Sequence, residues 1–174
     1  MRKVVIDCFP ESARKYRDGW AVVAVDVIRA TTSAVTVAAT GRRCFTVDTL
    51  ETAYTLAAQW ESPLLMGELK GDMPPGFDMN NSPVELLART DLDRPAILLS
   101  TSGTRLLYEA QKADARIPVC LRNWSSTVEW LAGRSARVAV IGPWSRGGVR
   151  AADQLMFAWG ERATTRAGSR GHEH

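Results

Sequence analysis

Short apolar runs alternate with segments of helical period along most of the chain. The longest run, residues 20 to 28, is almost unbroken by polar residues, which is typical of a strand buried on both faces of a sheet. Residues 50 to 60 instead place Leu50, Ala53 and Ala57 on one face of a helix. The whole pattern predicts strands at residues 4–8, 20–28, 44–47, 62–66, 95–100, 117–121 and 138–142, and helices at residues 31–39, 50–60, 83–89, 103–112, 125–131 and from about Val149.

This alternation predicts a three-layer α/β/α fold with a mostly parallel sheet in a single domain. We expect the domain to span residues 1–165 and residues 166–174 to form a disordered tail. In such a sheet, ligands bind beyond the carboxyl ends of the strands. The loops of interest therefore follow Ile28, Met66, Ser100, Leu121 and Gly142.

Length and composition narrow the class of protein. A chain of 174 residues with 45% hydrophobic content can bury one sizeable core, and it lacks an apolar run long enough for a membrane span, so we expect a cytoplasmic protein. Cys8, Cys44 and Cys120 lie far apart in apolar segments, which predicts free thiols. The net charge is +3, but the basic residues are scattered, so nucleic-acid binding is disfavoured.

Histidine occurs only at His172 and His174, within the expected tail. A folded domain without histidine excludes Ser-His-Asp and Cys-His catalysis, phosphohistidine chemistry and His-ligated zinc. The chemistry of this domain must then use carboxylates, hydroxyls, arginines and backbone amides.

The segment DVIRATT places charged and hydroxyl residues at the end of the long buried strand. Asp26 can hold Mg²⁺, while Arg29, Thr31 and Thr32 can bind phosphate at the start of the next helix. An Asp–Arg pair with a threonine N-cap is the alternative. An aspartyl nucleophile of the dehalogenase type needs a second Asp two residues later, where this chain has Ile28, so a metal ligand is the better interpretation of Asp26.

A second polar turn, LSTSGT, follows the apolar strand at residues 95–100. The hydroxyls and backbone amides of this turn can bind an anion ahead of a helix, although ordinary N-capping by Ser102 explains the motif nearly as well. The candidate phosphate-binding residues are Thr101, Ser102, Gly103 and Thr104.

A long segment without periodicity, residues 67–82, is rich in Gly, Pro, Asp and Asn. Ordered loops of this length commonly serve a functional site. Glu68 and Asp78 can add oxygen ligands for a hard cation, and Asn81 and Ser82 form an N-cap for the next helix. A solvated surface loop is the alternative.

The segment from Cys8 to Arg14 has the Cys-x5-Arg spacing of thiolate phosphatases. Glu11 would place a negative charge in the phosphate cradle, and the loop lacks glycine, so a capped turn is the favoured interpretation.

Near the end of the chain, PWSRGGVR can close over an acidic substrate through Arg146. Asp153 follows in the first turns of the last predicted helix, where a surface Asp favoured by the helix dipole is the simpler explanation.

Five motifs in order, DVIRATT, GELKGDMPPGFDMNNSP, LSTSGT, Arg122-Asn123 and AADQL, resemble the 2-phosphosulfolactate phosphatase (ComB) family. The resemblance spans roughly residues 4–159 and implies an α/β, Mg²⁺-dependent phosphatase acting on a 2-phospho-3-sulfolactate-like acid. Ser102 and Ala152 stand where the family usually has Asn and Glu. The matching positions are Asp26, Arg29, Thr31, Thr32, Glu68, Gly76, Phe77, Asp78, Asn81, Ser82, Thr101, Gly103 and Thr104.

We therefore expect Mg²⁺-dependent hydrolysis of a phosphate monoester of a small acidic molecule by a homo-oligomer, most simply a dimer. Another hydrolase, lyase or transferase on a related acid, or a non-catalytic anion-binding subunit, is the alternative. The expected metal ligands are Asp26, Glu68, Asp78 and Asp153, with Asp26, Arg29, Glu68 and Asp78 as catalytic residues. The expected phosphate-binding residues are Thr31, Thr32, Asn81, Ser82, Thr101, Ser102, Gly103, Thr104, Asn123 and Arg146.

Overall fold

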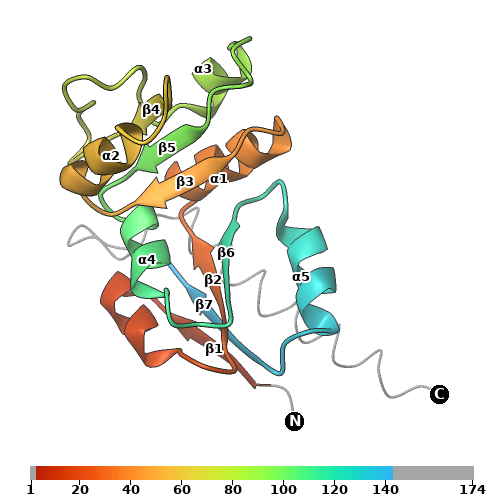
Figure 1. Ribbon diagram of the computed structural model, residues 1–174. Helices are drawn as coiled ribbons and strands as arrows, with labels where there is room; N and C mark the ends of the chain where they lie inside the picture. Colours follow the sequence, from red (N-terminus) through yellow and green to blue (C-terminus); the bar gives the residue numbers. More distant parts are fainter. Residues whose placement is uncertain (1–2, 143–174) are drawn as a thin grey trace.

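The computed structural model describes residues 3–142, in which strands and helices alternate (Figure 1). The strands are β1 (Lys3–Asp7), β2 (Ala21–Val25), β3 (Cys44–Val47), β4 (Leu64–Gly67), β5 (Ala96–Leu99), β6 (Ala115–Val119) and β7 (Arg137–Ile141). The helices are the 3-10 helix η1 (Pro10–Lys15) and the α-helices α1 (Ala30–Ala39), α2 (Leu50–Ala57), α3 (Pro83–Leu87), α4 (Gly103–Glu109) and α5 (Trp124–Ala132).

The strands form two sheets in which every pairing is parallel. One sheet has the order β1-β7-β2-β6 and the other has the order β3-β5-β4. This confirms the predicted α/β class with parallel strands. The division into two sheets is not encoded in the local period of the sequence, because that period reports burial and not which strands pair.

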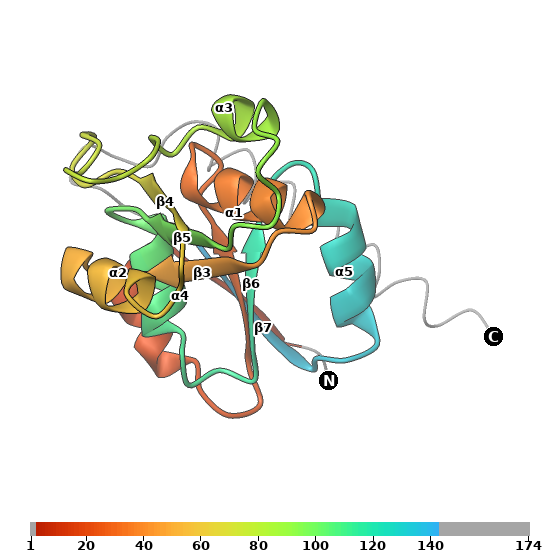
Figure 2. The same ribbon diagram turned by 45° about the horizontal axis from the view of Figure 1, so that its top comes forward.

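Helices cover both faces of each sheet, so each half is three layers deep (Figure 2). In the first sheet, η1 and α4 pack on one face and α5 packs on the other. In the second, α1 and α3 pack on one face and α2 on the other. The residues of β2 are all buried, as expected for a strand between two helical layers.

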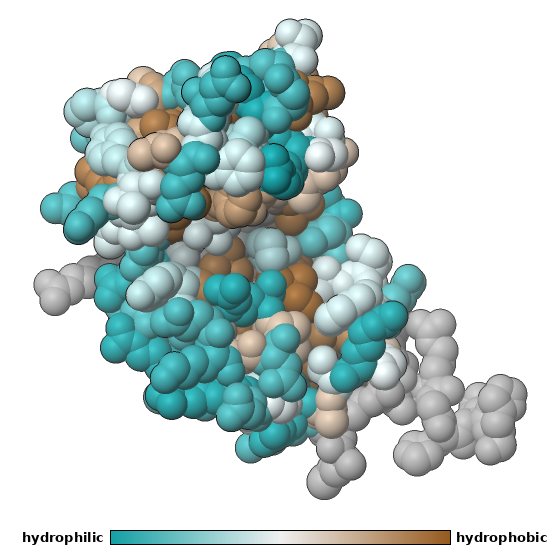
Figure 3. All heavy atoms as spheres, in the orientation of Figure 1, coloured by the Kyte–Doolittle hydropathy of each residue, from teal (hydrophilic) through white to brown (hydrophobic). Residues whose placement is uncertain are grey.

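Two crossings connect the sheets and determine where a site can form. The chain leaves the first sheet after β2, and α1 then packs on the second sheet; it leaves the second sheet after β5, and α4 returns to the first. The carboxyl ends of β2 and β5 therefore meet where the two halves join. On the face shown in Figure 3, apolar residues gather mainly in the middle of the view, between more hydrophilic regions.

The predicted elements within residues 3–142 are confirmed to within a few residues at their ends. Helix η1 was missed, because its six residues are too few to show a helical period. The last predicted helix and the expected tail lie outside the described residues. Among residues 3–142, no helix is long and apolar enough to cross a membrane.

Candidate active site at the junction of the two sheets

Asp26 directly follows β2 and is only 4% exposed. Its backbone amide donates to Thr31 Oγ1 at 2.9 Å, and the Thr31 hydroxyl donates to the carbonyl of Val119 at 2.7 Å. These bonds tie the end of β2 to the start of α1 and the end of β6. Thr32 likewise donates its hydroxyl to the carbonyl of Val27 at 2.7 Å. Both hydroxyl protons are therefore committed to the backbone around Asp26 and are not directed at a ligand.

Ser102 brings the second sheet into contact with Asp26. It is the N-cap residue of α4 but makes no side-chain capping bond, so the capping alternative for this residue is wrong. Its Oγ instead lies 3.4 Å from Asp26 Oδ2, a long O–H···O contact. A Cβ added at Gly103 would lie 2.5 Å from the same Oδ2, so the turn passes directly over the carboxylate.

Glu68 follows β4 and clamps the turn after β5. Its carboxylate accepts from the Thr101 amide at 2.8 Å, the Thr101 hydroxyl at 2.8 Å and the Gly71 amide at 2.7 Å. Burial acts to raise the pKa of Glu68, but the hydrogen bonds from Thr101 and Gly71 outweigh it and hold the pKa below its ordinary value. Glu68 is therefore an ionised residue whose oxygens are engaged by the turn.

Gly67 makes the contact between Glu68 and Thr101 possible. Its φ is +144°, and an added Cβ would lie 2.1 Å from the carbonyl oxygen of Leu99. Only glycine allows β4 and β5 to approach this closely where Glu68 leaves the sheet. Thr104 stabilises the turn after β5, because its buried hydroxyl donates to the carbonyl of Ser100 at 2.8 Å.

Arg29 and the end of the long loop lie beside the start of α1. The exposed Arg29 guanidinium donates to Asn80 Oδ1 at 3.4 Å, and the Asn81 amide donates to the same oxygen at 2.6 Å. Asn81 is 2% exposed, and its Oδ1 lacks a hydrogen-bond partner among the described residues. The predicted N-cap is confirmed, since the Ser82 hydroxyl accepts from the Glu85 amide at 3.3 Å.

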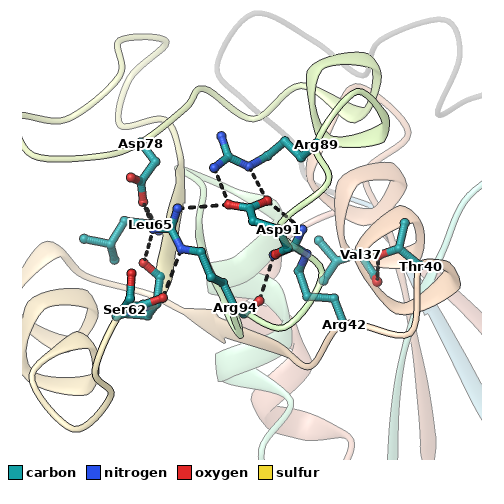
Figure 4. Close-up of polar contacts among 10 residues, drawn as sticks. Val37, Thr40, Arg42, Ser62, Leu65, Asp78, Arg89, Asp91 and Arg94 are labelled. Carbon is teal, nitrogen blue, oxygen red and sulfur yellow. Dashed lines mark hydrogen bonds and ion pairs between the residues drawn. The ribbon is translucent and has the colours of Figure 1, made fainter.

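Asp78 is placed in a different cluster (Figure 4). Its carboxylate accepts from the Leu65 amide at 2.9 Å and from the Arg94 guanidinium at 2.9 Å. Arg94 continues to Asp91, which also pairs with Arg42, whose side chain is fully buried. This network fixes the loops around β4 and does not bring Asp78 to Asp26. Within residues 3–142, no group of three or more His, Cys, Asp or Glu is arranged to hold a metal.

The Asn123 side chain bonds to the backbone of its own loop, between β6 and α5. Its Oδ1 accepts from the Cys120 amide at 2.9 Å, and its Nδ2 donates to the carbonyl of Pro118 at 3.0 Å. These bonds close the turn between β6 and α5 and leave little side-chain capacity for a ligand. Arg146 and Asp153 lie outside the described residues.

The Cys-x5-Arg segment is not assembled for thiolate chemistry. Burial, with a further contribution from the charge of Asp7, raises the pKa of the Cys8 thiol. Arg14 pairs with Glu109 of α4, with an Nη2–Oε1 distance of 2.6 Å. A protonated thiol and an arginine held by a carboxylate agree with the capped-turn interpretation.

The residues that meet here lie in a segment that matches a known protein family. Residues 8–158 match the family model described as 2-phosphosulpholactate phosphatase. The chain belongs to the 2-phosphosulfolactate phosphatase family. Asp26, Glu68 and the turn at residues 101–104 all fall within the matched region.

Curated members of the 2-phosphosulfolactate phosphatase family are similar over most of the chain. The probable 2-phosphosulfolactate phosphatase of Pseudothermotoga lettingae is 40% identical over 63% of this chain and 47% of its own length. That of Carboxydothermus hydrogenoformans is 34% identical over 74% of this chain and 53% of its own. The chain spans about half the length of the curated relatives it matches.

Two residues that shape this site do not stand out as candidates in the sequence. Gly67 was passed over, although a glycine between a buried strand and an acidic residue is a readable signal for close backbone approach. Lys70 lies in the segment without periodicity at residues 67–82, and nothing in the sequence indicates the left-handed backbone conformation that it adopts.

Proposed function

We propose that the chain is a Mg²⁺-dependent phosphatase that hydrolyses a phosphate monoester of a small acidic molecule similar to 2-phosphosulfolactate. The observation that carries this proposal is the contact between buried Asp26 and the turn at Ser102–Gly103, at the carboxyl ends of strands from two different sheets. Open parallel sheets bind their ligands at such positions. The substrate class is taken from the relatives, which are probable 2-phosphosulfolactate phosphatases.

The oxygen donors at this junction fit Mg²⁺. This ion typically keeps several waters and binds one or two carboxylates together with substrate phosphate oxygens, so it does not need a complete protein cage. The Asp26 carboxylate and the Ser102 hydroxyl are donors of the required kind. When bound there, the ion would neutralise charge on the phosphate and acidify a water molecule.

The protein residues have separate roles in this proposal. Asp26 is a fixed carboxylate whose backbone is held by Thr31, so it does not have to reorganise when ligands bind. Arg29 presents an exposed guanidinium that can bind phosphate oxygens. Glu68 has a lowered pKa and fully engaged oxygens, which make it a poor proton acceptor, so we assign it to positioning the turn.

The test is phosphate release from a panel of phosphorylated hydroxy acids, including 2-phosphosulfolactate, with and without Mg²⁺. We expect metal-dependent release by the wild type and a loss of about 100-fold or more in Asp26→Asn, because about 3 kcal/mol of transition-state stabilisation corresponds to that factor. Release from no substrate by folded protein would overturn the proposal and favour a binding subunit. A cytoplasmic location and a homodimer stay predictions from the sequence.

A further inference from the structure

Lys70 lies in a tight turn that is anchored on Thr101. Its backbone amide donates to Thr101 Oγ1 at 2.6 Å. Leu69 and Asp72, which enclose Lys70 and Gly71, bond to each other through their backbones at 2.8 and 3.2 Å. The Gly71 amide donates to Glu68 at 2.7 Å. The turn that carries Lys70 is thus fixed to the polar turn after β5.

The backbone of Lys70 is held in the left-handed region. Its φ is 57°, and it is the one residue other than glycine with a positive φ among residues 3–142. Glycine or asparagine would form this turn at lower conformational cost. Such conformations persist where the surroundings enforce them, often at functional sites. The presence of lysine here therefore calls for a role of its side chain.

The charge balance at the junction gives that side chain a role. Asp26 and Glu68 contribute two carboxylates next to the place where an anionic substrate would bind. Lys70 is exposed and forms no ion pair with any other described residue, so its ammonium is available to offset this charge. Arg29 is a second exposed cation, at the start of α1, where its guanidinium donates to Asn80 Oδ1 at 3.4 Å.

Lys70 contacts a different residue of the polar turn from the one that lies beside Asp26, where we propose that the phosphate binds. Ser102 touches Asp26, whereas the preceding residue, Thr101, touches Lys70. The Cα atoms of adjacent residues are about 3.8 Å apart, so these two contacts lie next to each other along the turn. The flexible four-carbon stem of lysine allows its ammonium to reach over this turn.

We propose that the Lys70 ammonium binds the second acidic group of the substrate, its carboxylate or sulfonate, and so makes the protein specific for phosphate monoesters that carry one. This inference rests on the proposed function. It makes Lys70 a specificity-determining residue that does not take part in breaking the phosphorus–oxygen bond.

Three variants separate the charge of Lys70 from its backbone conformation. Lys70→Asn removes the cation but keeps a residue that tolerates the left-handed conformation, and Lys70→Arg keeps the cation. Lys112→Asn removes an exposed lysine just after α4 and serves as the matched control. Each variant is assayed with 2-phosphosulfolactate and with an alkyl phosphate of the same chain length without a second acid.

We expect Lys70→Asn to raise KM for 2-phosphosulfolactate about 10- to 100-fold, because it removes a hydrogen bond to a charged group, with kcat nearly unchanged. KM for the alkyl phosphate should not change. Lys70→Arg should restore most of the affinity, and Lys112→Asn should behave as the wild type. An unchanged KM for both substrates, or equal effects on both, would overturn the inference.

A binding measurement tests the role of Lys70 even if the phosphatase proposal fails. If the wild type releases phosphate from no substrate, calorimetric titration with sulfolactate, which has the acidic groups but no phosphate, still tests Lys70. Binding by the wild type and Lys70→Arg that is lost in Lys70→Asn would support the inference. Absence of binding to the wild type, or equal binding by all three proteins, would refute it.

Discussion

Replacing Gly103 with alanine tests whether the two sheets really meet over Asp26. The added Cβ would lie 2.5 Å from Asp26 Oδ2, 2.5 Å from Ala30 Cβ and 3.0 Å from Asp26 Cβ. The first distance falls about 0.9 Å short of the 3.4 Å at which ordinary van der Waals contact begins. Ala30 Cβ is attached to α1 and cannot rotate away, so the turn or the start of α1 must shift.

The size of this shift sets the expected effects. Overpacking of a well-packed position costs about 1–3 kcal/mol, which lowers Tm by roughly 2–12 °C for a chain of this length. A displacement of about 1 Å at a catalytic group can lower kcat about 100-fold. We therefore expect Gly103→Ala to lose more activity than its modest loss of stability explains.

Gly133 provides the matched control for Gly103→Ala. It ends α5 with a φ of −98°, and a Cβ added there would meet nothing within 4 Å. Gly133→Ala should keep wild-type activity and gain slightly in Tm, since alanine restricts the unfolded chain. The assays are thermal unfolding by circular dichroism and phosphate release with Mg²⁺. Wild-type stability and wild-type kcat in Gly103→Ala would show that the contact over Asp26 is misplaced.

Two further substitutions address the roles of single residues. Glu68→Gln should lower Tm at pH 7 by a few °C. The pKa of Glu68 is lower in the folded protein than its ordinary value of 4.5, so its ionised form stabilises the fold fully above pH 4.5. This stabilisation is lost as the pH falls through the folded pKa, so the difference in Tm between the wild type and the variant should narrow at acidic pH. A constant gap across pH would contradict an ionised, hydrogen-bonded Glu68. Cys8→Ser should leave phosphate release unchanged, since the raised pKa of Cys8 keeps the thiol protonated, and a large loss of turnover would revive a thiolate mechanism.

Most of the helices and strands could be predicted because buried positions appear in the sequence as apolar residues with a characteristic spacing. The unbroken apolar run predicts β2 and the helical period predicts α2, and the observed elements agree. The pairing of β3, β4 and β5 into a separate sheet depends on contacts between distant segments, and no local pattern records these.

The candidate site was predictable in part for the same reason. Asp26 and the turn near Ser102 each end a buried strand, and the rule that ligands bind at strand carboxyl ends places both at a site. Asp78 carries the same chemical signal in sequence, yet Arg94 holds it in a structural network. A carboxylate in a polar loop does not reveal which cation it faces until the fold is known.

The proposed role of Asp26 in Mg²⁺-dependent turnover is tested most directly by comparing phosphate release at several Mg²⁺ concentrations in Asp26→Asn and Asp78→Asn. Both variants remove one negative charge, but only Asp26 lies at the junction of the sheets. We expect Asp26→Asn to lose nearly all turnover at any Mg²⁺ concentration, and Asp78→Asn to keep the wild-type Mg²⁺ response with a small loss of Tm. Equal losses in the two variants, or a loss confined to Asp78→Asn, would contradict the proposed role of Asp26.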